Sequence, residues 1–276
     1  MRVLIVSGSR ADLGLLHCPE KALREDGHKV TLKLIHGLGY KHAYATINHH
    51  LSLVHNPEDM MLVLGDRFEI LAAVTCAHLK RLPIAHIGGG DVTEGSYDDA
   101  MRDCISRMAS IHFATSFAST ARLVGFGYRN VHLVGNPAVD YIMHEAWQRE
   151  REIAEPYVVV SYQPETIDDT VDIETVNRAI SGRNAVWISP NPDRGSDRIP
   201  HGESYSHDRF LNLLYHCDEF IGNSSAMFYE APFLKPGGVK CRLIGKRQRG
   251  RVIPWGGEGR ASERIRDVLR LWPQSS

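Results

Sequence analysis

Seven titratable side chains gather within one short stretch of this 276-residue chain, and most of them follow apolar runs. They are Asp66, Glu69, His86, Asp91, Glu94, Asp98 and Asp99. The runs 60–64 and 83–87 each end in small or acidic residues, where a strand would pass into a loop. Parallel strands bring such loops to one edge of a sheet, where open α/β folds bind ligands. Several carboxylates at that edge predict proton-transfer chemistry; any one of them alone also fits a helix cap or a solvated loop acid.

The elements that must position these acids alternate between strand and helix. Apolar, β-branched runs are typical of strands buried on both faces of a parallel sheet, and the stretches between them have helical spacing. The expected strands are 3–6, 30–35, 60–64, 84–87, 111–114, 131–134, 157–161, 185–188, 219–221 and 240–244, and the expected helices are 11–25, 40–53, 68–80, 97–108, 116–124, 144–155, 171–180, 209–216, 225–233 and 261–271. Repeated strand–helix units of this length predict an α/β fold of doubly wound parallel sheets.

A charged tract, 144–155, divides this alternation into two halves. Because charge density rises there and a new apolar strand follows Pro156, we place a domain boundary near residue 150. Residues 1–150 and 151–276 are then two Rossmann-like domains facing across a cleft, the common place for a nucleotide-bearing ligand. The segment 189–204 has no periodicity and is either a mobile active-site loop or disordered.

The composition argues against several classes of protein. The net charge is −1, with 32 basic and 33 acidic residues, so no global charge directs the chain to nucleic acid or to a membrane. The five cysteines are odd in number, scattered and without CxxC spacing, which is typical of reduced thiols rather than of a zinc site or a disulfide framework. The N-terminus turns polar too soon for a signal peptide, and no apolar run approaches the ~20 residues of a membrane span. We therefore expect a soluble, cytoplasmic protein.

A second group of residues has the chemistry to hold an anionic ligand. Asn223, Ser224 and Ser225 stand at the start of an expected helix, whose unpaired N–H groups and dipole favour a diphosphate. An ordinary N-cap is the alternative. Arg10, after the first strand, can reach phosphate oxygens with its planar fork or serve as a structural salt-bridge partner.

Three parts of the sequence together resemble the hydrolysing UDP-N-acetylglucosamine 2-epimerase family and, more widely, the two-Rossmann glycosyltransferase-B architecture. The first is SGSRADLGLL at 7–16. The second joins LGDRFEILAAV at 64–74 to IAHIGGGDVTEGSYDDAMRD at 84–103. The third joins FIGNSSAMFYEAP at 220–232 to IGKRQRGR at 244–251. The order and spacing of these motifs hold across most of the chain, which identifies it as a divergent member of this superfamily, shortened between residues 39 and 57.

The resemblance implies a reaction in which UDP leaves C1 of the sugar while a base removes the C2 proton. The resulting glycal is hydrated from the other face to N-acetylmannosamine, and no metal or other cofactor is required. Proton-transfer roles fall by resemblance to Asp66, to Asp91 where the family usually has Glu, and to Asp98 or Asp99; Glu94 lies in the same motif. The N-terminal domain would thus face the sugar, and the C-terminal domain would bind the nucleotide diphosphate.

Several further residues receive roles from the resemblance. Glu230, nearly two turns into the expected helix 225–233, would accept the ribose hydroxyls; as an alternative it is a helical surface acid. His86 opens the HIGGG turn, whose glycines allow close approach of a ligand, and a capped strand-end histidine is the alternative. Arg67, beside Asp66, is a further candidate.

Six cations crowd into the twelve residues from 240 to 251. They are Lys240, Arg242, Lys246, Arg247, Arg249 and Arg251. A charge run is usually a solvated face. Here the glycines within the run and the family match favour contact with an anionic ligand. Arg247 and Arg251 are assigned to UDP. If the run faces outward, it could instead bind the phosphate backbone of a nucleic acid.

Two departures from the family pattern leave the specific activity open. Asp91 withdraws its carboxylate by about one methylene relative to Glu, and Gln163 replaces a family His, so this UDP-side residue can hydrogen-bond but cannot carry a proton.

One hypothesis is a hydrolysing epimerase. The alternative is a UDP-sugar glycosyltransferase with Asp66 or Asp91 as base; by analogy alone, the acceptor would be a modified base of phage DNA. A non-catalytic nucleotide-sugar-binding module is disfavoured because the acidic cluster persists. The expected partner is a small-molecule nucleotide sugar, and the resemblance suggests a homodimer or larger assembly.

Overall fold

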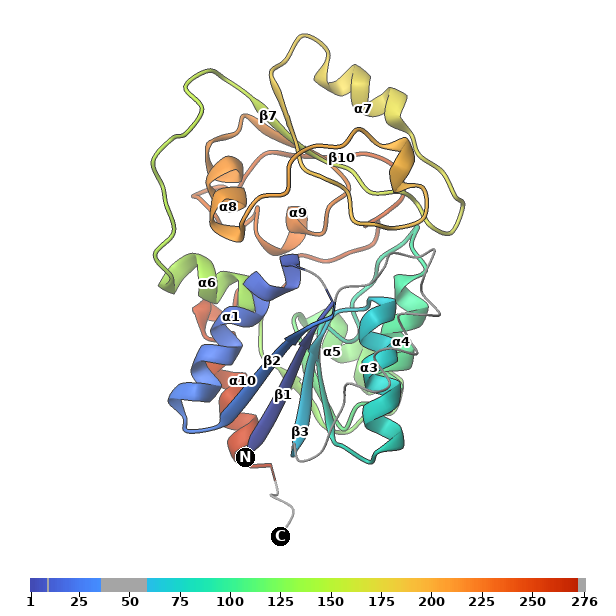
Figure 1. Cartoon of the computed structure of the whole chain (residues 1–276), viewed down its shortest axis with the longest axis vertical. Coiled ribbons are helices and arrows are strands. Elements are labelled where there is room, and N and C mark those ends of the chain that lie inside the picture. The colour runs from blue at the N-terminus through green and yellow to red at the C-terminus, as the bar shows by residue number, and fades with distance from the viewer. Residues whose placement is uncertain (9, 36–58, 273–276) are drawn as a thin grey trace. The chain divides into compact units, whose positions relative to one another are not determined.

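The computed structural model describes residues 1–8, 10–35 and 59–272 (Figure 1). The helix expected at 40–53 and the shortening expected between 39 and 57 lie outside these residues. None of the described helices has the length and apolar character needed to cross a membrane.

The chain forms two compact units. Unit 1 comprises residues 1–91, 98–143 and 254–276, and unit 2 comprises residues 92–97 and 144–253. This division by contacts differs from the division expected near residue 150 in two places. Residues 92–97 of the acidic motif belong to unit 2, and the C-terminal residues from 254 onward belong to unit 1.

Unit 1 is built on a parallel sheet of six strands with the order β2-β1-β3-β4-β5-β6. The strands are β1 (Arg2–Ser7), β2 (Lys29–Leu34), β3 (Met60–Leu64), β4 (Ile84–Ile87), β5 (Ile111–Ala114) and β6 (Val131–Leu133), and the helices are α1 (Arg10–Glu25), α3 (Phe68–Leu79), α4 (Asp98–Met108), α5 (Phe117–Gly125), α6 (Pro137–His144) and α10 (Ala261–Arg270). From β1 the chain adds β2 on one side of this strand and β3 to β6 on its other side, so the strand order changes direction between β1 and β3. Ligands of doubly wound folds bind outside the strand ends at such a switch point.

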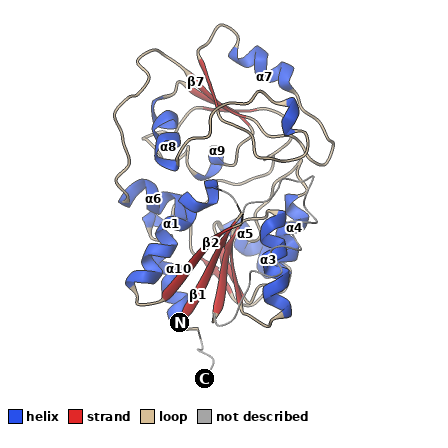
Figure 2. Cartoon of the chain, in the orientation of Figure 1, coloured by secondary structure: helices blue, strands red, loops and turns tan. Residues whose placement is uncertain are grey.

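The first strand shows why helices cover both faces of this sheet. Successive side chains of a strand point to opposite faces. Val3 and Ile5 accordingly pack in one buried cluster with residues of α1 and α10, whereas Leu4 and Val6 pack in another with residues of α3 and α4. Figures 1 and 2 show α1 and α10 on one side of the sheet and α3 and α4 on the other. The doubly wound arrangement predicted from the sequence is therefore confirmed.

A buried carboxylate attaches the C-terminal helix to unit 1. Asp140 of α6 is 2% exposed, and its two carboxylate oxygens accept hydrogen bonds from the backbone N–H groups of Ala261 (3.0 Å) and Ser262 (2.6 Å). These N–H groups stand at the start of α10, where the helix itself offers no partner and its dipole favours a negative charge.

Replacing Asp140 by Ala should lower the free energy of unfolding by about 3 kcal/mol, because two charge-assisted hydrogen bonds are lost and buried donors remain unpaired. Urea titration followed by circular dichroism measures this. The exposed Asp267 on α10 provides the matched control, and its replacement by Ala should cost less than about 0.5 kcal/mol. Equal effects of the two variants would contradict the capping role.

Unit 2 repeats the plan on a smaller scale. Its strands are β7 (Val158–Ser161), β8 (Ala185–Trp187), β9 (Glu219–Gly222) and β10 (Cys241–Leu243), and its helices are α7 (Ile173–Ile180), α8 (His207–His216) and α9 (Ala226–Tyr229), with a 3₁₀ turn at Ser196–Arg198. All strand pairs are parallel, in the order β10-β9-β7-β8. The switch point of this sheet lies between β7 and β9.

Two expected helices differ from those observed. The helix predicted at 144–155 is wrong: α6 ends at His144, and none of the described residues 145–155 is helical. Asn212 of α8 donates hydrogen bonds to the carbonyls of Gln148 and Glu150, so tertiary contacts take up backbone groups that a helix would use. The predicted helix 225–233 is only the single turn of α9, because Pro232 cannot donate to a helix and disfavours helical backbone before it.

Candidate active site

The loops at the switch point of unit 1 carry the first predicted site residues. Asp66 follows β3 directly after Gly65, whose φ of 83° favours glycine. Arg67 is paired with the buried Glu69 at 3.2 Å, so its guanidinium has a structural partner. Arg10 begins α1 after β1, and its side chain lies outside the described part of the structure. The turn at Asp66 therefore places a carboxylate where doubly wound folds bind their ligands.

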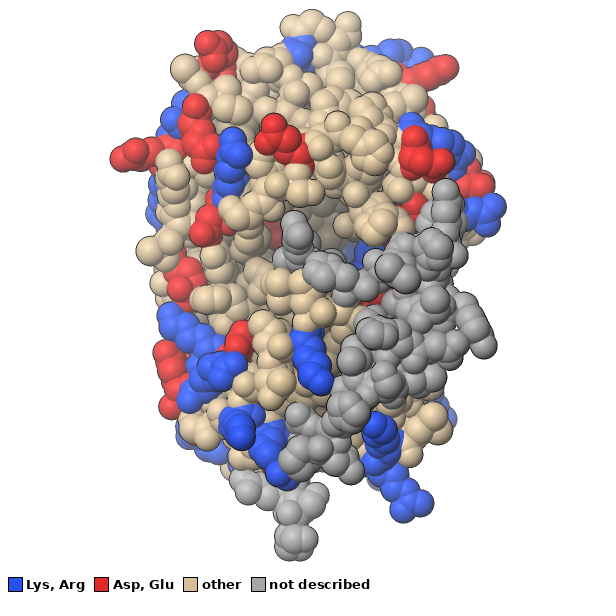
Figure 3. Space-filling view, in the orientation of Figure 1, with Lys and Arg blue, Asp and Glu red and all other residues tan. Residues whose placement is uncertain are grey.

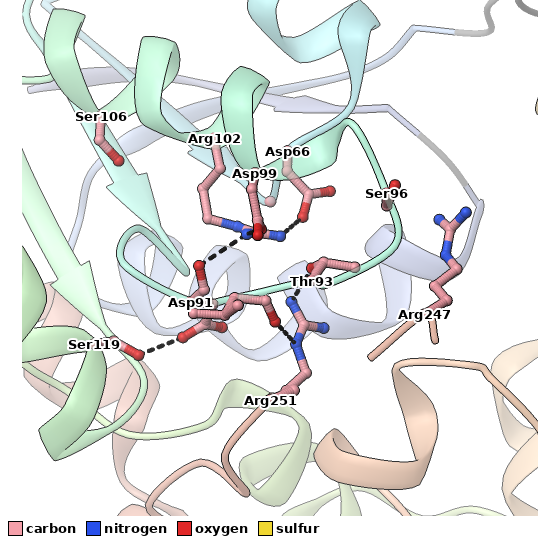
Figure 4. Close-up of polar contacts among 12 residues, drawn as sticks. Asp66, Asp91, Thr93, Ser96, Asp99, Arg102, Ser106, Ser119, Arg247 and Arg251 are labelled. Atoms are coloured by element: carbon pink, nitrogen blue, oxygen red, sulfur yellow. Dashed lines mark hydrogen bonds and ion pairs between the residues drawn. The ribbon is translucent and has the colours of Figure 1, made fainter. Parts of the chain in front are cut away.

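A buried arginine joins the predicted acids. Arg102 of α4 forms ion pairs with Asp66, after β3, and with Asp99, in the first turn of its own helix. Its Nη1 also donates a hydrogen bond to the backbone carbonyl of Asp91 at 2.8 Å. Figure 4 shows the guanidinium lying between the two carboxylates. The loop after β3 and the turn after β4 thus meet the first turn of α4 at one side chain.

The carboxylate of Asp91 is held by two hydroxyl groups, one directly after β5 and one in α5. Thr115 donates to it at 3.1 Å, and Ser119 donates to the same Oδ1 oxygen. The turn can pack this closely because Gly90 has a φ of 77°, and a Cβ there would lie 2.5 Å from the carbonyl oxygen of Ser119. Asp91 is therefore anchored at both its backbone and its side chain.

His86 lies beneath this cluster rather than at its surface. It is fully buried in β4, and its Nε2 lies 2.7 Å from the carbonyl of Gly65, which can only accept a hydrogen bond. The proton of the neutral ring is therefore on Nε2, and Nδ1 accepts from the Ser106 hydroxyl at 3.0 Å. Burial lowers the pKa of His86 to about 4. His86 thus holds the turn that presents Asp66 and stays neutral at pH 7.

A second buried histidine extends this row across the sheet. His112 of β5 is the register partner of His86 and stacks on Tyr128 with ring centroids 4.5 Å apart. Burial, with a smaller contribution from His132, lowers the pKa of His112 to about 4.

Unit 1 should therefore lose stability in acid. Both pKa values lie below the ordinary histidine value of 6.5, so between pH 6.5 and about 4 the unfolded chain binds more protons than the folded chain. The stabilisation is complete above pH 6.5 and falls by about 1.4 kcal/mol per histidine for each pH unit below it. Urea titrations at pH 7.5, 6 and 5 measure the slope, which His112→Phe should reduce. A slope unchanged by this substitution would contradict the assignment.

At the switch point of unit 2, the side-chain amide of Asn223 pairs with the backbone of Gln163. Asn223, after β9, is fully buried; its Oδ1 accepts from the Gln163 N–H at 2.6 Å, and its Nδ2 donates to the Gln163 carbonyl at 2.8 Å. The side-chain oxygen of Gln163 in turn accepts from the Asn191 N–H at 2.9 Å. Gln163 and Asn223 therefore connect loops that follow β7, β8 and β9. This anchoring is a role that the sequence did not predict for either residue.

The remaining predicted nucleotide-side residues lie around α9. Ser224 Oγ accepts from the Ala226 N–H at 3.3 Å, and Ser225 is exposed. Glu230 follows α9 directly instead of lying two turns into a helix, and its carboxylate lies 3.9 Å from Nε2 of His207. Because α9 has a single turn, its dipole contributes less to anion binding than the expected longer helix would.

The basic segment 240–251 is largely paired within unit 2. Lys240 and Arg242 contact the buried Glu219, Lys246 contacts Asp168, and Arg247 lies 3.6 Å from Asp193 and donates to the Pro164 carbonyl. Basic and acidic side chains are interleaved on the face of unit 2 at the top of Figure 3. Contact of this segment with an anionic ligand stays a prediction.

Residues 92–97 of the acidic motif are bound to this basic segment. Arg251 donates to the Val92 carbonyl at 3.0 Å and to the Thr93 hydroxyl at 2.9 Å (Figure 4). The Gln248 N–H donates to the Glu94 carbonyl at 3.1 Å. Glu94 therefore belongs to unit 2, whereas the acids that Arg102 joins belong to unit 1.

Comparison with known proteins identifies the family. Residues 30–255 match the sequence profile of UDP-N-acetylglucosamine 2-epimerase. The chain belongs to the UDP-N-acetylglucosamine 2-epimerase family. This is a family of enzymes, and the resemblance inferred from the three motifs is confirmed.

Relatives of this epimerase-family chain include enzymes from two bacteria. The UDP-N-acetylglucosamine 2-epimerase of Neisseria meningitidis serogroup B is 27% identical over 91% of this chain and 81% of its own length. The GDP/UDP-N,N'-diacetylbacillosamine 2-epimerase (hydrolyzing) of Campylobacter jejuni is 25% identical over 70% of this chain and 58% of its own length. The solved UDP-GlcNAc 2-epimerase of Methanocaldococcus jannaschii, in complex with UDP-GlcNAc and UDP, has a TM-score of 0.74 at 17% identity, covering 99% of this chain and all of that one. This likeness shows the fold.

The structure brings together part of the predicted epimerase site. Asp66, Asp91 and Asp99 meet at Arg102, and Asp98 begins the same helix as Asp99. The prediction missed Arg102, although its spacing of three residues from Asp99 is that of neighbours on a helix face. In the described part of the chain, no three His, Cys, Asp or Glu side chains are grouped to hold a metal ion.

Proposed function

We propose that this family member is a hydrolysing UDP-N-acetylglucosamine 2-epimerase, which converts UDP-N-acetylglucosamine and water to N-acetylmannosamine and UDP. The observation that carries the proposal is the meeting of Asp66 and Asp99 at Arg102, at the switch point of unit 1. The Campylobacter jejuni relative, a hydrolyzing 2-epimerase, supports the hydrolytic outcome.

The first step would be elimination. Positive charge develops at C1 as the C1–O bond to UDP breaks, and ionised carboxylates stabilise such charge. This charge also acidifies the C2–H bond, so a carboxylate can accept the proton; we assign this role to Asp66. In the second step water adds its hydroxyl to C1 of the glycal and a proton to C2 from the opposite face, which gives N-acetylmannosamine. No step requires a metal or a redox cofactor.

The nucleotide would be held by residues of unit 2. Ser225 is exposed at the start of α9, and Glu230 follows its last turn. We assign the diphosphate to Ser224 and Ser225 and the ribose hydroxyls to Glu230. Gln163 would contribute through position rather than through charge, since its side-chain oxygen accepts from Asn191.

Incubation of the protein with UDP-N-acetylglucosamine alone, followed by ¹H NMR and a UDP assay, tests the proposal. A hydrolysing epimerase releases N-acetylmannosamine and UDP in equal amounts. Formation of UDP-N-acetylmannosamine without UDP would identify a non-hydrolysing epimerase. Release of UDP only after an acceptor is added would identify a glycosyltransferase, and either of the last two results would overturn the proposal.

A further inference from the structure

Arg102 lies behind the carboxylates that it joins. Its side chain is 1% exposed, whereas those of Asp66 and Asp99 are 22% and 34% exposed. A substrate can therefore reach the two carboxylates but not the guanidinium. Any effect of Arg102 on the reaction must pass through the groups that it holds.

The guanidinium fixes both the position and the charge of these groups. It is planar and offers its donors in a rigid fork, so it sets the separation of two acceptors on different segments. By pairing with Asp66 and Asp99 while bonding the Asp91 carbonyl, it ties the loop after β3 to the turn after β4 and to α4. The positive charge of the guanidinium also lies directly against the Asp66 carboxylate, which favours the ionised form of that group.

Other charged groups near the guanidinium do not replace it. His86, which interacts electrostatically with Arg102 and Asp66, is neutral at pH 7 because burial lowers its pKa to about 4. Asp103, at the next position of α4, is acidic and therefore carries no positive charge. Neither group supplies the positive charge that Arg102 places against the Asp66 carboxylate.

We propose that Arg102 is a positioning residue of the epimerase: it holds the Asp66 and Asp99 carboxylates at a fixed separation and keeps Asp66 ionised for proton transfer, without touching the sugar. The proposal rests on the proposed function for its kinetic consequence. Its electrostatic part concerns the two carboxyl groups themselves and is measured without turnover.

Arg102→Lys is the first test. Lys keeps a positive charge but cannot span two acceptors with a planar fork, so we expect kcat to fall by about 10²-fold because a misplaced catalytic group costs that much. KM should change less than threefold. The acidic limb of the pH–rate profile should move to higher pH, because Asp66 loses part of the positive charge that favours its ionised form. Arg107→Lys, an exposed site on α4, is the matched control and should leave kcat, KM and the profile unchanged.

A charge-balanced variant covers the case in which Arg102→Lys does not fold. Arg102→Gln combined with Asp99→Asn removes one positive and one negative charge together, so no net charge is added to the buried cluster. The acidic limb should again move to higher pH, because Asp66 loses the cation that it contacts directly, but by less than loss of the cation alone would cause, because the negative charge of Asp99 is removed as well.

Carboxyl titration by ¹³C NMR separates this proposal from the proposed function. With ¹³C-labelled aspartate, the signal of Asp66, assigned through Asp66→Asn, should titrate at higher pH in either Arg102 variant than in the unmodified protein. If the unmodified protein releases neither UDP nor N-acetylmannosamine, the proposed function fails while this titration still decides the role of Arg102. A folded Arg102 variant with unchanged titration of Asp66, or with unchanged kcat and pH–rate profile in an active enzyme, overturns the proposal.

Discussion

Replacing Asp66 by Asn should lower the rate of UDP release from UDP-N-acetylglucosamine by about 10³-fold, within the range that a positioned acid–base group contributes. Asn has nearly the same shape as Asp and can still accept a hydrogen bond from Arg102, but it cannot take the C2 proton. Binding of UDP, which the proposed function assigns to unit 2, should change less than threefold. Initial-rate assays measure kcat, and isothermal titration calorimetry measures the dissociation constant of UDP.

The exposed Asp103 provides the control for Asp66. It lies on α4 beside Arg102, and its replacement by Asn also removes one negative charge near the guanidinium. Asp103→Asn should keep kcat within about threefold of the value for the unmodified protein. The reason is that the ion pair of Arg102 is with Asp66 rather than with this carboxylate. Full activity of Asp66→Asn would remove Asp66 from the mechanism.

The strands were the most predictable part of the fold. Parallel strands covered on both faces need continuous apolar runs, and the expected runs 60–64, 84–87 and 111–114 coincide with β3, β4 and β5. Their parallel direction follows from the repeated strand–helix units. Helix ends were harder, because Asn212 and Pro232 act through tertiary contacts and local backbone restrictions that override helical spacing.

The candidate site was predictable as a set of acids but not as an arrangement. Loops after parallel strands meet at one edge, which explains why Asp66 and Asp99 come together. Nothing in their own spacing indicates that Arg102 would be buried between them, since most arginines are exposed. The anchoring of Gln163 by Asn223 and Asn191 depends on three loops of unit 2 and has no local signal in the sequence.

Two strand ends approach each other closely in unit 2 at Gly222. This glycine, beside the predicted nucleotide-binding residues, is therefore highly sensitive to substitution by a residue with a Cβ. Gly222 ends β9 with a φ of 134°, which L side chains rarely adopt. A Cβ at this position would overlap the carbonyl oxygen of Ser161 and lie 3.2 Å from the Tyr162 nitrogen. The Ser161 carbonyl also accepts the Asn223 N–H at 3.1 Å, so it cannot move away without breaking the connection between β7 and β9.

Gly222→Ala should therefore lower the free energy of unfolding of unit 2 by about 4 kcal/mol or more, the range in which backbone strain and overpacking add. UDP binding should be lost with it, because Asn223, Ser224 and Ser225 follow this residue directly. Gly182→Ala is the matched control: its φ of 73° also favours glycine, but nothing lies within 4 Å of the added Cβ, so only the backbone cost of about 1–2 kcal/mol applies. Urea unfolding and calorimetric UDP titration of both variants measure the difference. Equal stability of the two variants would show that the contact with Ser161 relaxes at little cost, and that β7 and β9 are not held at a fixed separation.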